Sequence, residues 1–434
     1  MPVPSWRLAA AAAVIAGLVL LSPAPGLALV AANGALLLVA VVDWGLAPSA
    51  RRLQVTRSVP GIVALDSEAE VVWKVRNPIR RRLRVRLADE LVPSLGADSR
   101  RARLDLPPLG AASAHTRLRP QRRGRFDLTT ITLRVQGPLG LTARQGDVVV
   151  PGVVRVYPPF RSRAEAELRL SRSRVLQVGL RAAQGRGGGT EFDSLREYSV
   201  DDEFRRIDWA ATARARKPIV RTYRAERNQT VLVLLDSGRT MAGRVEGVPR
   251  LDHAMDAVMM MTAVATRLGD RAGLVAFSDR VRGVVGPSSG RAQLSTVTES
   301  MYRLEPELVE SDYRGAFVET LGRFRRRALL VVLTELAEQA VAETLMPALP
   351  LVVRDHLVIV AAVRDPVVAR WASAVPVEAG AAYRKAAAVQ AIEQRRHTVG
   401  RLRGLGAVVI DAPPGRLAPE LADAYLKVKS TGRL

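Results

Sequence analysis

The chain has 434 residues, a formal net charge of +23 and no cysteine, so disulfides, zinc–thiolate sites and cysteine nucleophiles are excluded and stability depends on packed cores. Its four histidines, His115, His253, His356 and His397, lie in unrelated segments without the spacing of a metal site or of a Ser-His-Asp triad. The positive charge is compatible with binding to nucleic acid or to an anionic membrane surface, although an aromatic content of 4% offers few stacking platforms for single strands.

Two apolar runs without a charge lie near the N-terminus, Leu8 to Leu21 and Leu27 to Val42. The segment Ser22 to Gly26 between them contains two prolines and a glycine, which break a helix and favour a turn. The pattern therefore predicts a transmembrane helical hairpin. Arg7 precedes the first run and Arg51-Arg52 follow the second, so the positive-inside rule places both ends and the soluble bulk in the cytoplasm. A cleavable signal peptide is the alternative, because a basic residue, a short apolar core and small residues also fit that outline.

Short alternating runs of apolar and polar residues follow, as far as about Val156. Turn residues such as Asn77-Pro78 and Gly137-Pro138 separate them, and this punctuation predicts an antiparallel, immunoglobulin-like sandwich. Two basic clusters, Arg80 to Arg84 and Arg117 to Arg125, are either solvated strand faces or sites for anionic lipid or a partner. The predicted strands are Leu53 to Thr56, Glu70 to Val75, Leu83 to Ala88, His115 to Leu118, Arg125 to Leu128, Thr130 to Val135 and Val148 to Val156.

A connector rich in arginine, alanine and glycine runs from Arg161 to Gly189. Its glycines are not followed by Lys-Ser/Thr, so the composition predicts a flexible linker rather than a phosphate loop.

From Thr230 onward, short apolar strands alternate with helices such as Leu251 to Leu268. This pattern predicts a mostly parallel, doubly wound sheet that helices cover on both faces. The predicted strands are Val231 to Leu235, Arg271 to Phe277, Ala328 to Leu333, Leu357 to Val363 and Ala407 to Ile410.

The segment between the connector and the first of these strands is dense in opposite charges, which arginine forks can pair bidentately. It is predicted to be a folded arm pinned by ion pairs, a docking surface for another protein, or a pair of carboxylates for acid–base catalysis. No nucleophile or oxyanion-binding group accompanies the carboxylates, so we expect no catalytic residue and no enzyme. The candidate partner-binding residues are Glu191, Phe192, Arg196, Tyr198, Asp202, Arg205, Asp208, Trp209 and Arg214.

This segment and the Leu234-Leu235-Asp236 that follows it resemble the signature of the domain of unknown function 58 (DUF58) family. The resemblance extends to Arg122 to Phe126 and Gly137 to Gly140, which look like the end of that family's sandwich, and to Tyr425 to Lys429, which look like its closing helix. One departure is Asp201-Asp202, where the family usually has glycine before the aspartate of its turn. The resemblance implies a membrane protein with a von Willebrand factor A-like domain and a MoxR-type AAA+ ATPase as partner.

The expected fold class is α/β. A doubly wound, von Willebrand A-like parallel sheet domain at 230–434 is preceded by the connector and signature segment at 161–229. The antiparallel sandwich occupies 49–160 and the transmembrane helical hairpin 1–48.

Von Willebrand A domains of the metal-binding type hold Mg²⁺ through an Asp-x-Ser-x-Ser motif, a residue of a middle loop and an aspartate after a later strand. Here the first motif reads Asp236-Ser237-Gly238-Arg239-Thr240, with Ser311 or Asp312 in the middle loop and Glu335 after the later strand. The resemblance therefore implies a degenerate Mg²⁺ site formed by Asp236, Thr240, Ser311 and Glu335. The alternative is that Asp236 pairs with Arg239 or another arginine and that no cofactor binds.

These features predict a membrane-anchored cytoplasmic adaptor that acts with a MoxR-type AAA+ ATPase. The chain has no phosphate loop of its own, so the partner would supply ATP hydrolysis. The alternative is an electrostatic nucleic-acid or anionic-surface binding protein. Neither a sequence-specific nucleic acid nor a small-molecule substrate is expected.

Overall fold

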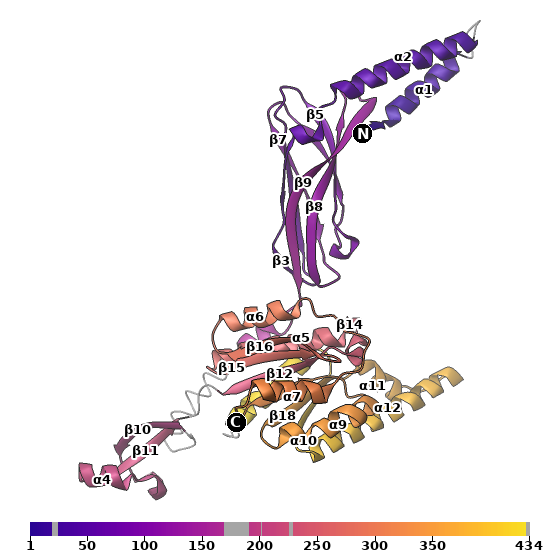
Figure 1. Ribbon diagram of the computed structural model, residues 1–434. Helices are drawn as coiled ribbons and strands as arrows, with labels where there is room; N and C mark the ends of the chain where they lie inside the picture. The colour runs from indigo at the N-terminus through magenta and orange to yellow at the C-terminus, as the bar shows by residue number, and fades with distance from the viewer. Residues whose placement is uncertain (20–24, 169–190, 201, 225–228, 431–434) are drawn as a thin grey trace. The chain divides into compact units, whose positions relative to one another are not determined.

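The computed structural model describes residues 1–19, 25–168, 191–200, 202–224 and 229–430 (Figure 1). The chain is a mixed α/β protein with two compact units, Met1–Tyr157 and Pro158–Leu434. Most of the predicted connector lies outside the described residues, and its described part is helical over residues 163–168.

The first unit begins with strand β1 (Pro2–Pro4) and two apolar helices, α1 (Trp6–Val19) and α2 (Pro25–Leu46), which lie side by side (Figure 1). The 22 residues of α2 give a length of about 33 Å, which matches a hydrocarbon core of about 30 Å. The 14 residues of α1 reach only about 21 Å. By length and composition, one helix in the described part of the chain can cross a membrane.

Two sheets and one shared core complete the first unit. A six-stranded sheet has the order β1-β9-β8-β5-β6 with β3 beside β9, and a three-stranded sheet has the order β2-β4-β7. Along β4, the alternate residues Val71, Trp73 and Val75 are buried, as period-two patterning predicts. The strands are β2 (Gln54–Ser58), β3 (Ile62–Ala64), β4 (Ala69–Arg76), β5 (Leu83–Asp89), β6 (Arg101–Leu106), β7 (Ala111–Leu118), β8 (Gly124–Gln136) and β9 (Thr142–Tyr157).

The second unit contains a sheet of order β16-β15-β12-β17-β18-β19. Five strands pair in parallel, and β16 pairs antiparallel with β15 at the edge. Along β12, Val231 and Val233 face one core while Leu232 and Leu234 face another, so both faces of the sheet are buried. The strands are β12 (Thr230–Asp236), β15 (Arg271–Phe277), β16 (Val281–Ser288), β17 (Leu329–Leu333), β18 (Leu357–Val363) and β19 (Val408–Ala412).

Helices cover the two faces of this sheet (Figure 1). Residues of α5, α6 and α13 belong to the first core, and residues of α7 and α10 belong to the second. Strand β16 is an element that the sequence patterns did not predict, whereas α12 lies between two predicted strands, where a helix was expected. The helices are α5 (Arg250–Arg267), α6 (Ala292–Met301), α7 (Tyr313–Arg323), α8 (Glu338–Ala340), α9 (Met346–Ala348), α10 (Pro350–Val353), α11 (Pro366–Ser373), α12 (Ala379–Gly404) and α13 (Leu417–Ser430).

Candidate functional site

Asp236 lies at the carboxyl end of β12, where a parallel sheet presents polar groups from neighbouring loops. Its carboxylate is fully buried and receives four donors. Oδ1 accepts from the Gly238 amide at 2.8 Å and from the Ser311 hydroxyl at 2.6 Å. Oδ2 accepts from the Thr334 hydroxyl at 2.6 Å and from the Tyr313 hydroxyl at 3.0 Å. We call Asp236 and these four residues the Asp236 cage.

Tyr313 connects two of the elements that form the cage. Tyr313 is the first residue of α7, and Thr334 directly follows β17. Their hydroxyl oxygens lie 2.7 Å apart. Burial, followed by the nearby negative charge of Asp236, raises the pKa of Tyr313 well above its ordinary value. The phenol therefore stays protonated and donates to the carboxylate at physiological pH.

Gly238 stands where the metal-binding motif has a serine. A Cβ at this position would lie 2.1 Å from the Ser311 hydroxyl oxygen, so Ser311 already fills the space of that side chain. Arg239 does not pair with Asp236, because its guanidinium lies 2.5 Å from Glu310 in an exposed ion pair. Asp312 instead caps α7, because its side chain accepts a hydrogen bond from the Gly315 amide at 2.9 Å.

Glu335 belongs to a separate buried ion network. Its carboxylate pairs with Arg250 at 2.8 Å and with Arg395 of α12, which also holds Asp411 of β19 at 2.9 Å. Burial opposes the charge of Arg395, but Glu335 and Asp411 outweigh it and raise the pKa of the guanidinium. Of the four predicted metal ligands, all within the described residues, only Asp236 and Ser311 are thus joined by a hydrogen bond. The hydroxyl oxygen of Thr240 is buried without a hydrogen-bond partner.

This arrangement does not fit a divalent cation. Mg²⁺ takes oxygen ligands in near-octahedral geometry and usually more than one negative charge. Here both oxygens of Asp236 already accept hydrogen bonds, and two arginines neutralise Glu335. In the described part of the chain, no three carboxylate or histidine side chains gather as a metal site would require.

The charged signature folds as a small arm, residues 191–200 and 202–224, which we call the signature arm. Strands β10 (Glu191–Glu197) and β11 (Ile219–Arg224) pair antiparallel, and a short 3-10 turn (Phe204–Arg206) and α4 (Trp209–Ala215) lie between them in sequence. In that pairing, the backbone of Glu191 is opposite Arg224 and that of Phe192 is opposite Tyr223.

Two aspartates tie the signature arm together. Asp208 caps α4 by accepting from the Ala211 amide at 3.0 Å, and it pairs with Arg221 at 2.7 Å. The hydrogen bond from Ala211 lowers the pKa of Asp208 most, and Arg221 lowers it further. The guanidinium of Arg196 donates hydrogen bonds to both carboxylate oxygens of Asp202, at 2.8 and 2.5 Å. Both carboxylates are therefore engaged in structural contacts.

Aromatic and cationic groups remain exposed on the signature arm. The rings of Phe204 and Trp209 meet edge to face with centroids 5.6 Å apart, and the two residues are 68% and 61% exposed. Arg205 and Arg214 are also exposed, and Arg214 donates to the Ala210 carbonyl at 3.2 Å. Tyr198 is half-buried, with its amide bonded to the Pro218 carbonyl at 2.9 Å.

The sequence did not single out Thr334, Tyr313, Arg250 or Arg395. Thr334 could have been found, because a hydroxyl residue directly after a buried strand lies at the same sheet edge as Asp236. No sequence signal gives the position of Arg395, because it lies in the middle of α12, far along the chain from Glu335.

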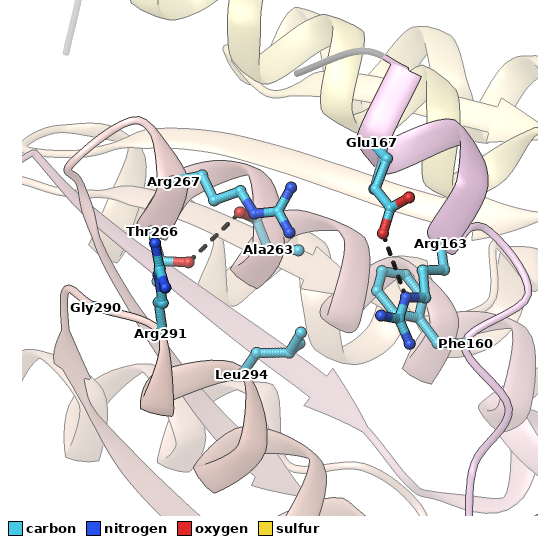
Figure 2. Close-up of a pocket in the computed structure, with 10 residues that line it drawn as sticks. Phe160, Arg163, Glu167, Ala263, Thr266, Arg267, Gly290, Arg291 and Leu294 are labelled. Carbon is cyan, nitrogen blue, oxygen red and sulfur yellow. Dashed lines mark hydrogen bonds and ion pairs between the residues drawn. The ribbon is translucent and has the colours of Figure 1, made fainter. Parts of the chain in front are cut away.

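A cavity of about 700 Å³ lies away from the Asp236 cage, between residues 160–167 and the helices α5 and α6 (Figure 2). Thr266 and Arg267 line it near the end of α5, and Arg291 lines it at the start of α6. Figure 2 also shows Arg163 paired with Glu167 on the opposite wall, at 3.4 Å. No residue of the cage lines this cavity.

Comparisons with known proteins give a family match over part of the chain and no activity. The uncharacterized proteins Mb1516 of Mycobacterium bovis and Rv1480 of Mycobacterium tuberculosis are each 26% identical over 151 residues, 34% of this chain and 48% of theirs. The chain thus spans about half the length of these curated relatives. The CARDB domain of a Pyrococcus furiosus protein is 18% identical with a TM-score of 0.18, over 24% of this chain and 91% of that domain. Residues 194–376, which include most of the signature arm and the Asp236 cage, match the family model described as protein of unknown function DUF58.

Proposed function

We propose that this protein is a membrane-anchored interaction protein without catalytic activity, and that its signature arm is the docking surface. One observation carries the proposal. The carboxylates Asp202 and Asp208 are held by arginines within the arm, while the large apolar side chains Phe204 and Trp209 face solvent. Exposed aromatic residues next to arginine are the typical anchors of protein interfaces.

The architecture supports a von Willebrand A-like assignment of the second unit. Parallel strands in the order β15-β12-β17-β18-β19, an antiparallel edge strand and an aspartate at the end of β12 are features expected of such a domain. The position of α1 beside α2 supports a membrane hairpin. Arg7, Arg51 and Arg52 flank the two helices and favour the cytoplasm for the soluble parts.

The partner that we propose is a MoxR-type AAA+ ATPase, as the DUF58 resemblance implies. Arg205 and Arg214 give the signature arm an exposed positive charge, so an acidic surface on the ATPase would complement it. The Asp236 cage, already satisfied internally, would contribute to the rigidity of the sheet rather than to a metal-mediated grip.

Crosslinking in membranes followed by purification of the full chain tests this proposal. We expect an AAA+ ATPase to be recovered with the wild type, and recovery to fall roughly tenfold or more when Phe204 and Trp209 are both changed to Ser. Trp371→Ser, which alters a 47% exposed tryptophan of α11, is the matched control and should leave recovery unchanged.

Two results would contradict the proposal separately. Repeated recovery of wild-type protein without any ATPase would exclude the partner. Equal recovery with the Phe204/Trp209 variant, whose folding is checked by circular dichroism, would exclude the signature arm as the contact surface.

A further inference from the structure

The end of α2 is fixed to the sandwich by one buried carboxylate. Asp43 accepts hydrogen bonds from the amides of Leu139, Leu141 and Thr142 at 2.7, 2.9 and 2.8 Å. It also accepts from the Thr142 hydroxyl at 3.0 Å. At Gly137, a Cβ would lie 2.4 Å from the Asp43 carboxyl carbon, so only glycine allows this approach. Helix α2 therefore meets the β8–β9 loop at a defined position.

The N-terminal segment is attached to the same loop. Strand β1 pairs with the start of β9, with Pro2 opposite Arg144. The Ser5 hydroxyl donates to the Gly140 carbonyl at 2.7 Å, just before α1 begins. The start of α1 and the end of α2 are thus held at one end of the sandwich.

Arginines from four separate segments gather at this end. Arg144 of β9 lies over the ring of Trp44, 5.4 Å from its centroid, and Arg81 donates to the Leu46 carbonyl at the end of α2. Arg7 lies at the start of α1, and Arg51 and Arg52 form the short helical turn after α2. We call Arg7, Arg51, Arg52, Arg81 and Arg144 the arginine collar.

The arginine collar carries uncompensated charge. Within the described residues, no carboxylate forms an ion pair with any of its five members. The neighbouring acid, Asp43, is completely buried and its oxygens accept hydrogen bonds from the loop. Arg7, Arg51 and Arg52 are exposed to solvent.

We propose that the arginine collar binds the phosphate groups of anionic phospholipids around α2. This inference rests on the membrane anchor of the proposed function. The side chains of Leu37 and Leu38 on α2 are 66% and 67% exposed, so an apolar surface that lipid would cover leads directly to the arginine collar. Guanidinium groups pair bidentately with phosphate, and tryptophan and arginine at a helix end are typical of the membrane interface.

The test uses the full chain reconstituted into phosphatidylcholine vesicles with and without phosphatidylglycerol. Spin-labelled lipids report the relative affinity of the protein for the two headgroups. We expect wild type to prefer phosphatidylglycerol and to lose that preference at high salt. Changing Arg51, Arg52 and Arg144 together to Gln should reduce the preference roughly tenfold or more.

A second triple variant supplies the control. Arg119, Arg125 and Arg155 lie near the other end of the sandwich, where β9 ends at Tyr157, so their change to Gln removes the same charge elsewhere. Equal loss of preference in both triple variants would overturn the arginine collar as a site. Binding of an oligonucleotide that the collar variant alone loses, with headgroup preference retained, would also overturn it in favour of nucleic acid.

Failure of the membrane anchor gives a different result from failure of the arginine collar. If the chain does not float with vesicles of either composition, the anchor itself is wrong. If it floats with both but shows no headgroup preference, the anchor stands and the collar proposal is refuted.

Discussion

Replacing Arg395 by Met should destabilise the carboxyl edge of the second sheet. Arg395 pairs with Glu335 and Asp411, whose side chains are only 8% and 18% exposed, and donates to the Val363 carbonyl at 3.3 Å. Removing one partner of a buried ion pair costs about 3–5 kcal/mol. Glu335 keeps its 2.8 Å pair with Arg250, so Asp411 is the group left unpaired and we expect the lower value, about 3 kcal/mol.

Hydrogen exchange of the amides of β19 and α12 in the full chain, held in detergent micelles, measures this loss locally without assuming that both units unfold together. Arg396→Met is the control, because Arg396 is an exposed neighbour on the same helix and should change the opening free energy by less than about 0.5 kcal/mol. Adding Asp411→Asn to Arg395→Met should recover part of the loss. Equal effects of the two arginine variants would contradict a stabilising role for the ion pairs of Arg395.

Three further predictions concern the second unit. Gly238→Ser should destabilise it by about 1–3 kcal/mol in thermal unfolding, and adding Ser311→Ala should restore stability, because both side chains need one space. Burial raises the pKa of Asp256 in the folded protein, so its stabilising contribution is present at low pH and is lost as the pH rises through that pKa. Asp256→Asn should therefore be more stable than wild type near neutral pH. The difference in unfolding free energy should shrink toward about pH 4. Calorimetric titration with Mg²⁺ should give only heat of dilution, and saturable binding that Asp236→Asn abolishes would contradict our view of the cage.

Many individual elements were predictable from local pattern. Helix Leu251 to Leu268 corresponds to α5, because its apolar residues follow the helical period. Two predicted strands, Arg125 to Leu128 and Thr130 to Val135, form the single strand β8, since an irregularity between Leu128 and Thr130 shifts the register without ending the pairing. The edge strand β16 is half-buried along most of its length, so its apolar signal is weak.

Two members of the Asp236 cage were predicted, Asp236 from its strand and Ser311 from the family resemblance. Asp236 follows an unbroken apolar strand, so its place at the sheet edge follows from the sequence. The role of Glu335 does not, because its neighbour Thr334 reaches Asp236 while Glu335 pairs with Arg395 on a helix 60 residues later. Which of two adjacent polar residues contacts the cage depends on tertiary packing, which spacing along the chain does not encode.

Gly137 to Gly140 resembles a family motif in the sequence, and the structure gives a physical reason for its two glycines. Gly137 makes room for the Asp43 carboxylate, and Gly140 adopts a φ of 75°, a left-handed value that favours glycine. The residues between them turn the chain so that the Leu139 and Leu141 amides reach Asp43. Asp43 lies at the end of an apolar helix, where an unpaired charge would be costly, so the loop both satisfies the carboxylate and fixes the helix to the sandwich. The position of the arginine collar follows from this contact, because Arg144 lies two residues beyond Thr142, which also bonds to Asp43.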